Sequence, residues 1–181
     1  MTPMSEIDVY RRLFGERFEE LDALLADLPD EALLWTPFET SPWRGSSNPF
    51  GLIIAHAVSS TVYLLLRAEW SMGWRDGSTV DGDEGPDEFG PANYRVEYLA
   101  ERVQRVHARV DVFLDQVTAS DLDATQPHWE DADRLLSARY DVVHAIEHLS
   151  EHIGQAQITR QLWALSQPAS RLFQKRRPMA Q

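Results

Sequence analysis

The sequence contains no cysteine, and its basic residues are far outnumbered by acidic ones. The absence of cysteine excludes disulfides, thiolate metal ligands and a cysteine nucleophile. Histidine, aspartate and glutamate are therefore the strong metal ligands that remain. The 17 basic and 29 acidic side chains give a formal net charge of −12. Because nucleic acids and anionic membranes are polyanions, this charge argues against either as the main partner.

Targeting signals and long apolar runs are also missing. Residues 1–8 show no basic stretch followed by an apolar run, so no signal peptide is predicted. The most apolar stretch, residues 50–66, is interrupted by His56 and by three hydroxyl side chains, and it is shorter than the ~20 residues of a membrane span. We expect a soluble, cytoplasmic protein that does not bind a membrane.

Strand signals are absent too, and the chain instead shows four segments of helical periodicity. Apolar residues recur three and four positions apart over residues 5–28, 48–72, 93–117 and 131–165. Ser5 is the expected N-cap of the first segment, and Asn48, followed by a proline, that of the second. Four amphipathic helices without strands predict an all-α fold, a helix bundle.

The length of 181 residues suits one domain, which we place at residues 1–170, followed by a short basic tail at 171–181. Two connections are long. Residues 29–47 are rich in aromatic side chains and are expected to pack over one end of the bundle, as a wall of any pocket there. Residues 73–92 hold five of the nine glycines and six acidic residues, which indicates a solvated loop or a mobile lid.

The candidate chemistry lies in the histidines of the last predicted helix. His144, His148 and His152 are each four residues apart, so neighbouring pairs share one helical face and two imidazoles can meet one metal ion. They belong to a polar band that also holds Asp141, Gln155 and Thr159. This band runs directly beside the predicted core stripe, which comprises Leu135, Ala138, Val142, Ile146, Leu149, Ile153 and Ala156. A polar band in that place can line a crevice between helices.

His56 is the candidate for a third ligand. It lies in the most apolar predicted helix, which is expected to be buried on more than one face, so its imidazole needs a polar partner inside the protein. The ordinary alternatives are a chance His-x-x-x-His pair and a core histidine satisfied by a hydrogen bond. His107 and His128 are assigned to the surface or to packing.

The last predicted helix also resembles a known family. Its residues His148, His152, Gly154 and Gln155 match the His-xxx-His-x-Gly-Gln signature of the DinB-like (DinB/YfiT) metal-dependent enzymes. The single His56 on the second helix matches the family pattern as well. So does the upstream segment Leu34-Trp35-Thr36-Pro37, and the resemblance covers about residues 5–165.

The resemblance implies a four-helix bundle with up-down-down-up connectivity and one divalent metal ion, zinc or nickel. By the family pattern His56, His148 and His152 would be the ligands. His144 and Gln155 are expected to support them without binding the ion, since His144 lies about 12 Å along the helix axis from His152. Homodimers are common in the family. Its branches include hydrolase-like proteins and S-transferases or isomerases that use mycothiol or bacillithiol.

Two enzyme classes and one non-enzymatic class stay open at this point. A three-histidine ion can activate water, which gives a hydrolase, or a low-molecular-weight thiol, which gives an S-transferase acting on a small-molecule substrate. A thiolate would be repelled by the acidic protein unless Arg44, Arg67 or Arg75 turned inward. Glu147 and Glu151 point away from the band, so no catalytic residue is assigned. The alternative is a non-enzymatic, stress-related helical module with a structural metal or none.

Overall fold

The computed structural model describes residues 4–40, 45–80, 89–128, 131 and 133–168. These residues are mostly helical. The four long helices are α1 (Glu6–Leu25), α3 (Phe50–Ser71), α4 (Val96–Gln116) and α5 (Ala138–Ser166). The shorter elements are α2 (Asp30–Leu33), the 3₁₀ turns η1 (Gly77–Thr79), η3 (Pro91–Asn93) and η4 (Asp121–Asp123), and the strands β1 (Thr125–Pro127) and β2 (Leu135–Ser137).

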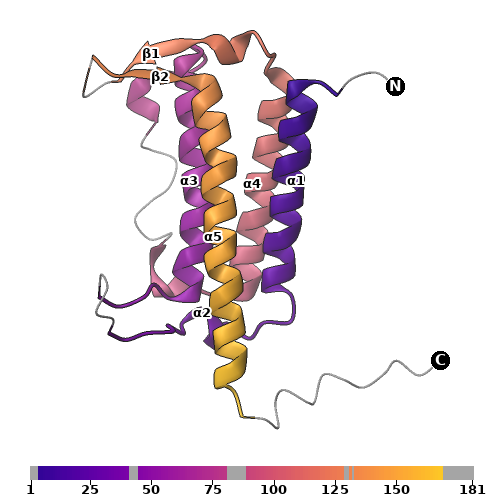
Figure 1. Cartoon of the computed structure of the whole chain (residues 1–181), viewed down its shortest axis with the longest axis vertical. Helices are drawn as coiled ribbons and strands as arrows, with labels where there is room; N and C mark the ends of the chain where they lie inside the picture. The colour runs from indigo at the N-terminus through magenta and orange to yellow at the C-terminus, as the bar shows by residue number, and fades with distance from the viewer. Residues whose placement is uncertain (1–3, 41–44, 81–88, 129–130, 132, 169–181) are drawn as a thin grey trace, which may run out of the picture.

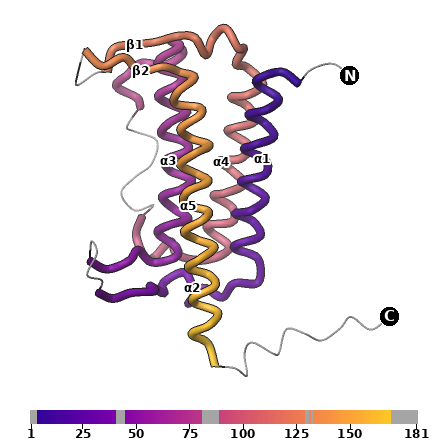
Figure 2. The backbone as a smooth tube through the Cα atoms, viewed as in Figure 1, coloured from indigo at the N-terminus to yellow at the C-terminus, as the bar shows by residue number. Residues whose placement is uncertain are grey.

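The four long helices lie side by side along the longest axis of the molecule (Figures 1 and 2). Followed by colour in Figure 1, α1 and α5 run down the view, whereas α3 and α4 run up it. Helix α3 packs against α5 and α4, and α1 packs against the same two helices. Each long helix therefore turns its apolar stripe toward two neighbours, and one continuous core of buried residues fills the space between them.

Helix α1 begins as the sequence predicts. The Ser5 hydroxyl accepts a hydrogen bond from the Asp8 backbone, and the Asp8 carboxylate accepts one from the Ser5 backbone, which forms a capping box. Helix α3 begins at Phe50 with Pro49 as its N-cap, one residue later than predicted from Asn48. The helix ends at 25, 71 and 116 also fall slightly inside the predicted ends, as frayed termini usually do.

The expectation of a strand-free chain is wrong at one place. Thr125–Pro127 and Leu135–Ser137 form a two-stranded antiparallel sheet, with Gln126 opposite Leu136. The predicted start of the last helix near residue 131 is wrong for the same reason, because α5 begins at Ala138 after the strand. The alternation of side chains along the strand also reverses the burial expected for two neighbouring leucines. Leu136 is 2% exposed in the core, whereas Leu135, which we placed in the core stripe, is 65% exposed.

Helix α3 is long and apolar enough to cross a membrane by length and composition. Most of that stretch is buried inside the protein, however, among the other long helices. Its apolar character is therefore explained by its central place in the core.

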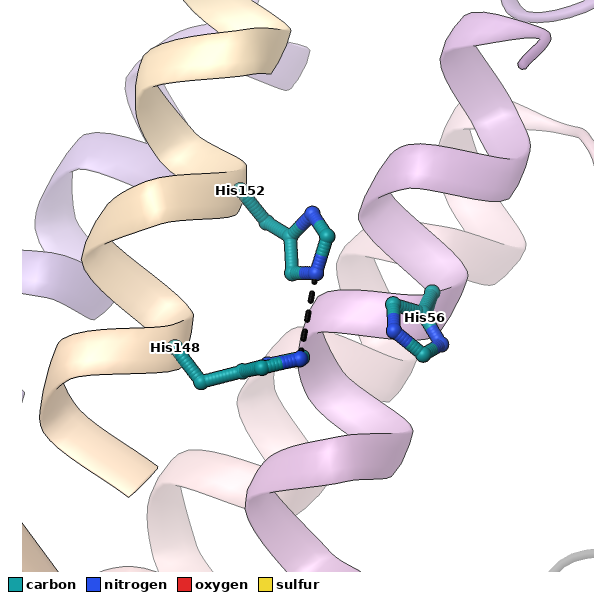
Figure 3. Close-up of side chains that lie close together, drawn as sticks. All are labelled: His56, His148 and His152. Atoms are coloured by element: carbon teal, nitrogen blue, oxygen red, sulfur yellow. Dashed lines mark hydrogen bonds between the residues drawn. The ribbon is translucent and has the colours of Figure 1, made fainter. Parts of the chain in front are cut away.

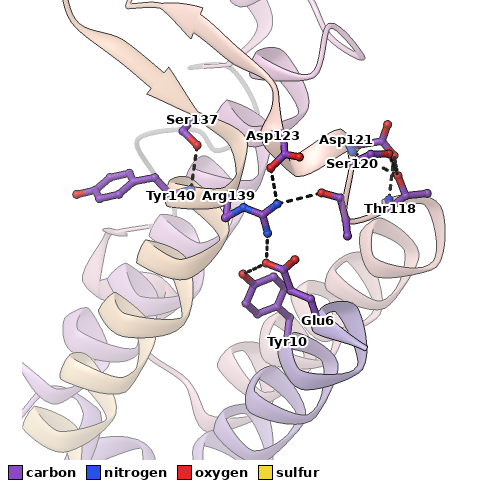
Figure 4. A network of polar contacts seen from close by, with 10 residues as sticks. Glu6, Tyr10, Thr118, Ser120, Asp121, Asp123, Ser137, Arg139 and Tyr140 are labelled. Carbon is purple, nitrogen blue, oxygen red and sulfur yellow. Dashed lines mark hydrogen bonds and ion pairs between the residues drawn. The ribbon is translucent and has the colours of Figure 1, made fainter. Parts of the chain in front are cut away.

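A polar network holds the start of α5 against the start of α1 (Figure 4). The Arg139 guanidinium forms an ion pair with Glu6. It also donates hydrogen bonds to the Ala119 carbonyl at 3.0 Å and to the Asp123 carboxylate at 2.6 Å. Glu6 also accepts from the Tyr10 hydroxyl at 2.6 Å, and these hydrogen bonds, first of all the one from Arg139, lower the pKa of Glu6. The network joins α5 to three other segments at its first turn and so restrains how the helix is set against its neighbours.

Gly51 offers a direct test of the packing at the start of α3. A Cβ atom at this position would lie 2.6 Å from Cγ of Tyr94 and 3.0 Å from the Leu33 carbonyl oxygen. We expect Gly51→Ala to lower the free energy of unfolding by about 1–3 kcal/mol, since a well-packed core cannot absorb the methyl group. Gly15→Ala is the matched control, because nothing lies within 4 Å of its Cβ position. It should stabilise α1 by roughly 0.5–1 kcal/mol, and urea unfolding measures both. A Gly51→Ala protein as stable as Gly15→Ala would contradict this packing.

Candidate metal site

Three histidines from two helices meet between α3 and α5. His56 comes from α3, and His148 and His152 come from successive turns of α5 (Figure 3). One ring nitrogen from each lies within 4.8 Å of the other two. The ring centroid of His56 lies 5.2 Å from the ring centroid of His148 and 4.7 Å from that of His152. Helix packing thus brings together residues that are about 90 positions apart in the chain.

The spacing of these nitrogens matches a metal ion. Nε2 of His148 and Nε2 of His152 are 3.3 Å apart. Two nitrogens each ~2.0–2.1 Å from an ion with tetrahedral geometry lie roughly 3.3–3.4 Å from one another. The α5 pair therefore already has the separation that two ligands of one ion require, and His56 faces the pair from across the groove.

Gln155 orients His152. Its side-chain oxygen lies 2.9 Å from Nδ1 of His152. Because an amide oxygen can only accept, this contact favours the tautomer with the proton on Nδ1, in which the Nε2 that lies 3.3 Å from His148 carries the lone pair. An outer partner of this kind is what metal-binding histidines ordinarily have. The structure places Gln155 beside a candidate ligand, where the sequence analysis expected support.

Burial favours the neutral form of two of the imidazoles. It lowers the pKa of His148 to about 4, with further lowering from His152, His56 and His144. The pKa of His56 is also lowered, first by burial and then by His152. A neutral imidazole can donate its lone pair to a metal, so a lowered pKa favours the metal-binding form of both side chains.

His56 differs from expectation in its surroundings. Helix α3 is buried at most positions, but His56 lies on the side of the helix that keeps contact with solvent. Its Nε2 is 3.4 Å from the Ser60 hydroxyl one turn later. The expected enclosed imidazole is thus a partly exposed one. An ion held there would be reachable by a substrate.

His144 is not part of the group of converging nitrogens. Its ring stacks on Tyr140, with 5.5 Å between centroids, and meets the edge of His148 at 5.9 Å. Its Nδ1 lies 3.5 Å from the exposed carboxylate of Glu147. The side chain therefore packs beside His148 without a hydrogen bond to it, which is compatible with the supporting role we expect.

We expect His144→Ala to weaken divalent metal binding by about tenfold, the lower end of the 10–100-fold range for outer partners, since only packing is lost. His144→Phe keeps a ring between Tyr140 and His148 and should bind metal as the unmodified protein does. Competition of Zn²⁺ against a chelating dye measures both affinities. If His144→Ala abolished binding as completely as His148→Ala, His144 would be a ligand and the assignment would be wrong.

The other histidines and the arginines lie elsewhere. His107 stacks on Phe18 in the α1–α4 contact, with 4.6 Å between centroids, which is the packing role that the sequence predicted. Arg67 forms an ion pair with the fully buried Asp141 at 2.9 Å, and Arg75 binds Glu69 at 2.9 Å. Arg44 lies outside the described residues. Arg67 and Arg75, the two described arginines that were considered as partners of a thiolate, are therefore paired with carboxylates.

The sequence analysis missed a cleft beside the histidines. The cleft has a volume of about 560 Å³ and is lined by α5, the start of α3, residues 37–38 and residues 46–48. The available signal was the pair of apolar positions Ile158 and Leu162, which lie off the core stripe of α5. Pro37 and Phe38 line this cleft, as expected of a wall, whereas residues 41–44 of the same segment and residues 81–88 of the expected lid lie outside the described residues.

Comparison with known proteins agrees with this architecture. A family model described as the DinB superfamily matches residues 13–156, a range that includes all three histidines. The crystal structure of a conserved protein from Enterococcus faecalis is similar to this chain. The TM-score is 0.62 and the sequence identity 18%, over 88% of this chain and 98% of that one. At this identity the likeness concerns the fold alone. No protein with a curated description matches the chain.

Proposed function

This chain belongs to the DinB superfamily, and on that premise we propose that it is a metal-dependent hydrolase acting on a small molecule. One divalent ion, zinc or nickel, would be held by His56, His148 and His152. The observation that carries the proposal is the convergence of three imidazole nitrogens within 4.8 Å of one another at the edge of a cleft.

The donor set fits a catalytic ion better than a structural one. Structural zinc sites are closed by four protein ligands, whereas catalytic sites combine three protein ligands with an open position. Among the described residues, the group of converging ligands is these three histidines. With three neutral ligands, the ion would strongly lower the pKa of a water or thiol bound to it. Gln155 would hold His152 in the binding tautomer, and the low pKa values of His148 and His56 would keep both available.

Water is the better-supported nucleophile. An anionic thiol cosubstrate needs a cationic partner in a protein of this net charge, and the two described arginines considered for that role are paired with Asp141 and Glu69. Water carries no charge and needs no such partner. The exposed carboxylates of Glu147 and Glu151 lie on the outer side of α5, so we assign neither a proton-transfer role.

The proposal extends to the fold and the assembly. The directions of α1, α3, α4 and α5 in Figure 1 support an up-down-down-up four-helix bundle, which is the connectivity implied by the family resemblance. A homodimer is the state we propose for the working enzyme, on the family resemblance alone.

A comparison of two reactions tests the proposed activity. The Zn²⁺- or Ni²⁺-loaded protein is assayed with a panel of uncharged esters and amides. It is then assayed with small thiols and an electrophilic acceptor. We expect metal-dependent hydrolysis that His56→Ala reduces at least about 100-fold, since its imidazole would be one of three ligands. Arg12→Ala, which changes an exposed side chain of α1 away from the histidines, is the control and should retain most activity.

The alternatives predict different results. Thiol consumption without hydrolysis would identify an S-transferase. Cobalt-loaded protein whose visible spectrum does not respond to azide or to a small thiol would indicate a closed structural ion. Either result would overturn the proposed hydrolase.

A further inference from the structure

The cleft beside the three histidines is continuous with them. On α5, Gln155 lies three residues after His152, and on α3, Ile53 lies three residues before His56; both line the cleft. Three residues correspond to about 4.5 Å along a helix axis. Gln155 also touches His152 directly through the 2.9 Å hydrogen bond. The end of the cleft at Gln155 and Ile53 therefore lies within one helical turn of the candidate ligands.

The wall opposite α5 is fixed in place. The Ser47 hydroxyl accepts from the Phe38 backbone at 3.0 Å and donates to its carbonyl at 3.1 Å, while the Ser47 backbone donates to the same carbonyl at 3.0 Å. In addition, the Phe50 backbone donates to the Trp35 carbonyl at 3.1 Å. The bonds of Ser47 tie the two described arms of the wall to each other, and the bond to Trp35 ties the wall to the start of α3, so these parts of the cleft are in place without a ligand.

The described lining of the cleft is uncharged and partly apolar. Phe38, Ile53, Ile158 and Leu162 supply apolar surface, and none of the described lining residues carries a charge. Two of the lining hydroxyls are already engaged inside the protein. That of Ser47 bonds to Phe38, and that of Thr159 donates to the Gln155 carbonyl at 2.8 Å. A charged group placed here would give up part of its hydration and would meet no opposite charge among the described lining residues.

From this the geometry points to an uncharged acyl or alkyl group as the part of the substrate that the cleft binds, with the reacting bond directed toward the histidines. This inference rests on the proposed function and adds to it the chemical class of the substrate. The volume of about 560 Å³ lies within the range of small-molecule pockets. The substrate is therefore an ester, an amide or a similar neutral compound with an apolar arm.

Probe binding tests the cleft independently of activity. The probes are n-butyl acetate, which is uncharged, and hexanoate, which has a similar apolar length and a negative charge. Saturation-transfer NMR on the full-length, metal-free protein should detect n-butyl acetate and show at least fivefold weaker transfer to hexanoate. The ring resonances of His152 should shift when n-butyl acetate is added.

Two matched variants locate the binding. Ile158 is 61% exposed and lines the cleft, whereas Leu165 is 75% exposed on the same helix and does not line it. Ile158→Trp should reduce saturation transfer to n-butyl acetate at least fivefold, and Leu165→Trp should leave it unchanged. Neither change touches a buried residue, so both proteins are expected to fold.

The outcomes separate the cleft from the metal. Equal transfer to both probes, or no difference between Ile158→Trp and Leu165→Trp, would overturn the inference. So would binding that leaves the His152 resonances unmoved. A protein that binds n-butyl acetate as expected but takes up no Zn²⁺ or Co²⁺ would refute the proposed function while the assignment of the cleft as a neutral binding site stands.

Discussion

Replacing His148 and His152 together with alanine is expected to reduce the divalent metal content from about one ion per chain to background. The two nitrogens that lie 3.3 Å apart would both be lost, and the remaining His56 cannot hold an ion alone. Loss of even an outer partner costs 10–100-fold in affinity, so we expect the affinity to fall by more than about 100-fold. Elemental analysis after loading with Zn²⁺ or Ni²⁺ and dialysis measures the content.

The matched control for this double change is Glu147→Gln/Glu151→Gln. These acids have the same spacing of four on α5, yet they project outward from the helix. Their replacement should leave metal content at about one ion per chain. Circular dichroism of both variants checks that α5 is intact. Metal content that survives the histidine double change would end the idea of a site between α3 and α5.

Arg67→Leu is expected to cause a large loss of stability. Asp141 is fully buried, and its counter-ion Arg67, at 2.9 Å, is 9% exposed. Removing one partner of a buried ion pair leaves an uncompensated charge, which typically costs about 3–5 kcal/mol. Urea unfolding at pH 7.5 should therefore show a free energy of unfolding lower by about 3 kcal/mol. Arg11→Leu, which breaks an exposed pair with Asp115, should change it by less than about 1 kcal/mol.

The double variant Arg67→Leu/Asp141→Leu completes this test. An apolar pair of similar volume removes both charges at once, and we expect it to recover most of the lost stability. Arg67→Leu with unaltered stability would show that the ion pair does not stabilise the α3–α5 contact. A double variant no more stable than the single one would attribute the loss to packing of the Arg67 side chain instead of to the charge of Asp141.

The same pair predicts a pH dependence. Burial raises the pKa of Asp141 to about 6, against the lowering effect of Arg67. The folded protein therefore binds a proton more tightly than the unfolded chain. The stability from this group is fully present below its ordinary pKa near 4 and is lost as the pH rises to about 6. In Asp141→Asn this loss, roughly 2–3 kcal/mol, should disappear from the unfolding free energy measured between pH 4 and 7. The same fall in both proteins would contradict the raised pKa.

The local features of the fold were readable from the sequence, because they depend on neighbouring residues. The three-four spacing of apolar residues predicted the four long helices, and Ser5 with Asp8 predicted the capping box that opens α1. The short sheet was not predicted, since three-residue strands carry too few positions for a periodic pattern. That omission also misplaced Leu135 and the start of α5.

The candidate site divides in the same way. The spacing of His148, His152 and Gln155 is a property of one helix, so the sequence by itself determined that they share a face; it also determined the family, through the signature that α5 carries. That His56 faces this pair, that Arg67 reaches Asp141, and that a neutral cleft lies beside Gln155 depended on how α3 and α5 pack. Only the tertiary structure decided these contacts, because the distance between two helices depends on side chains along their whole interface and not on any local pattern.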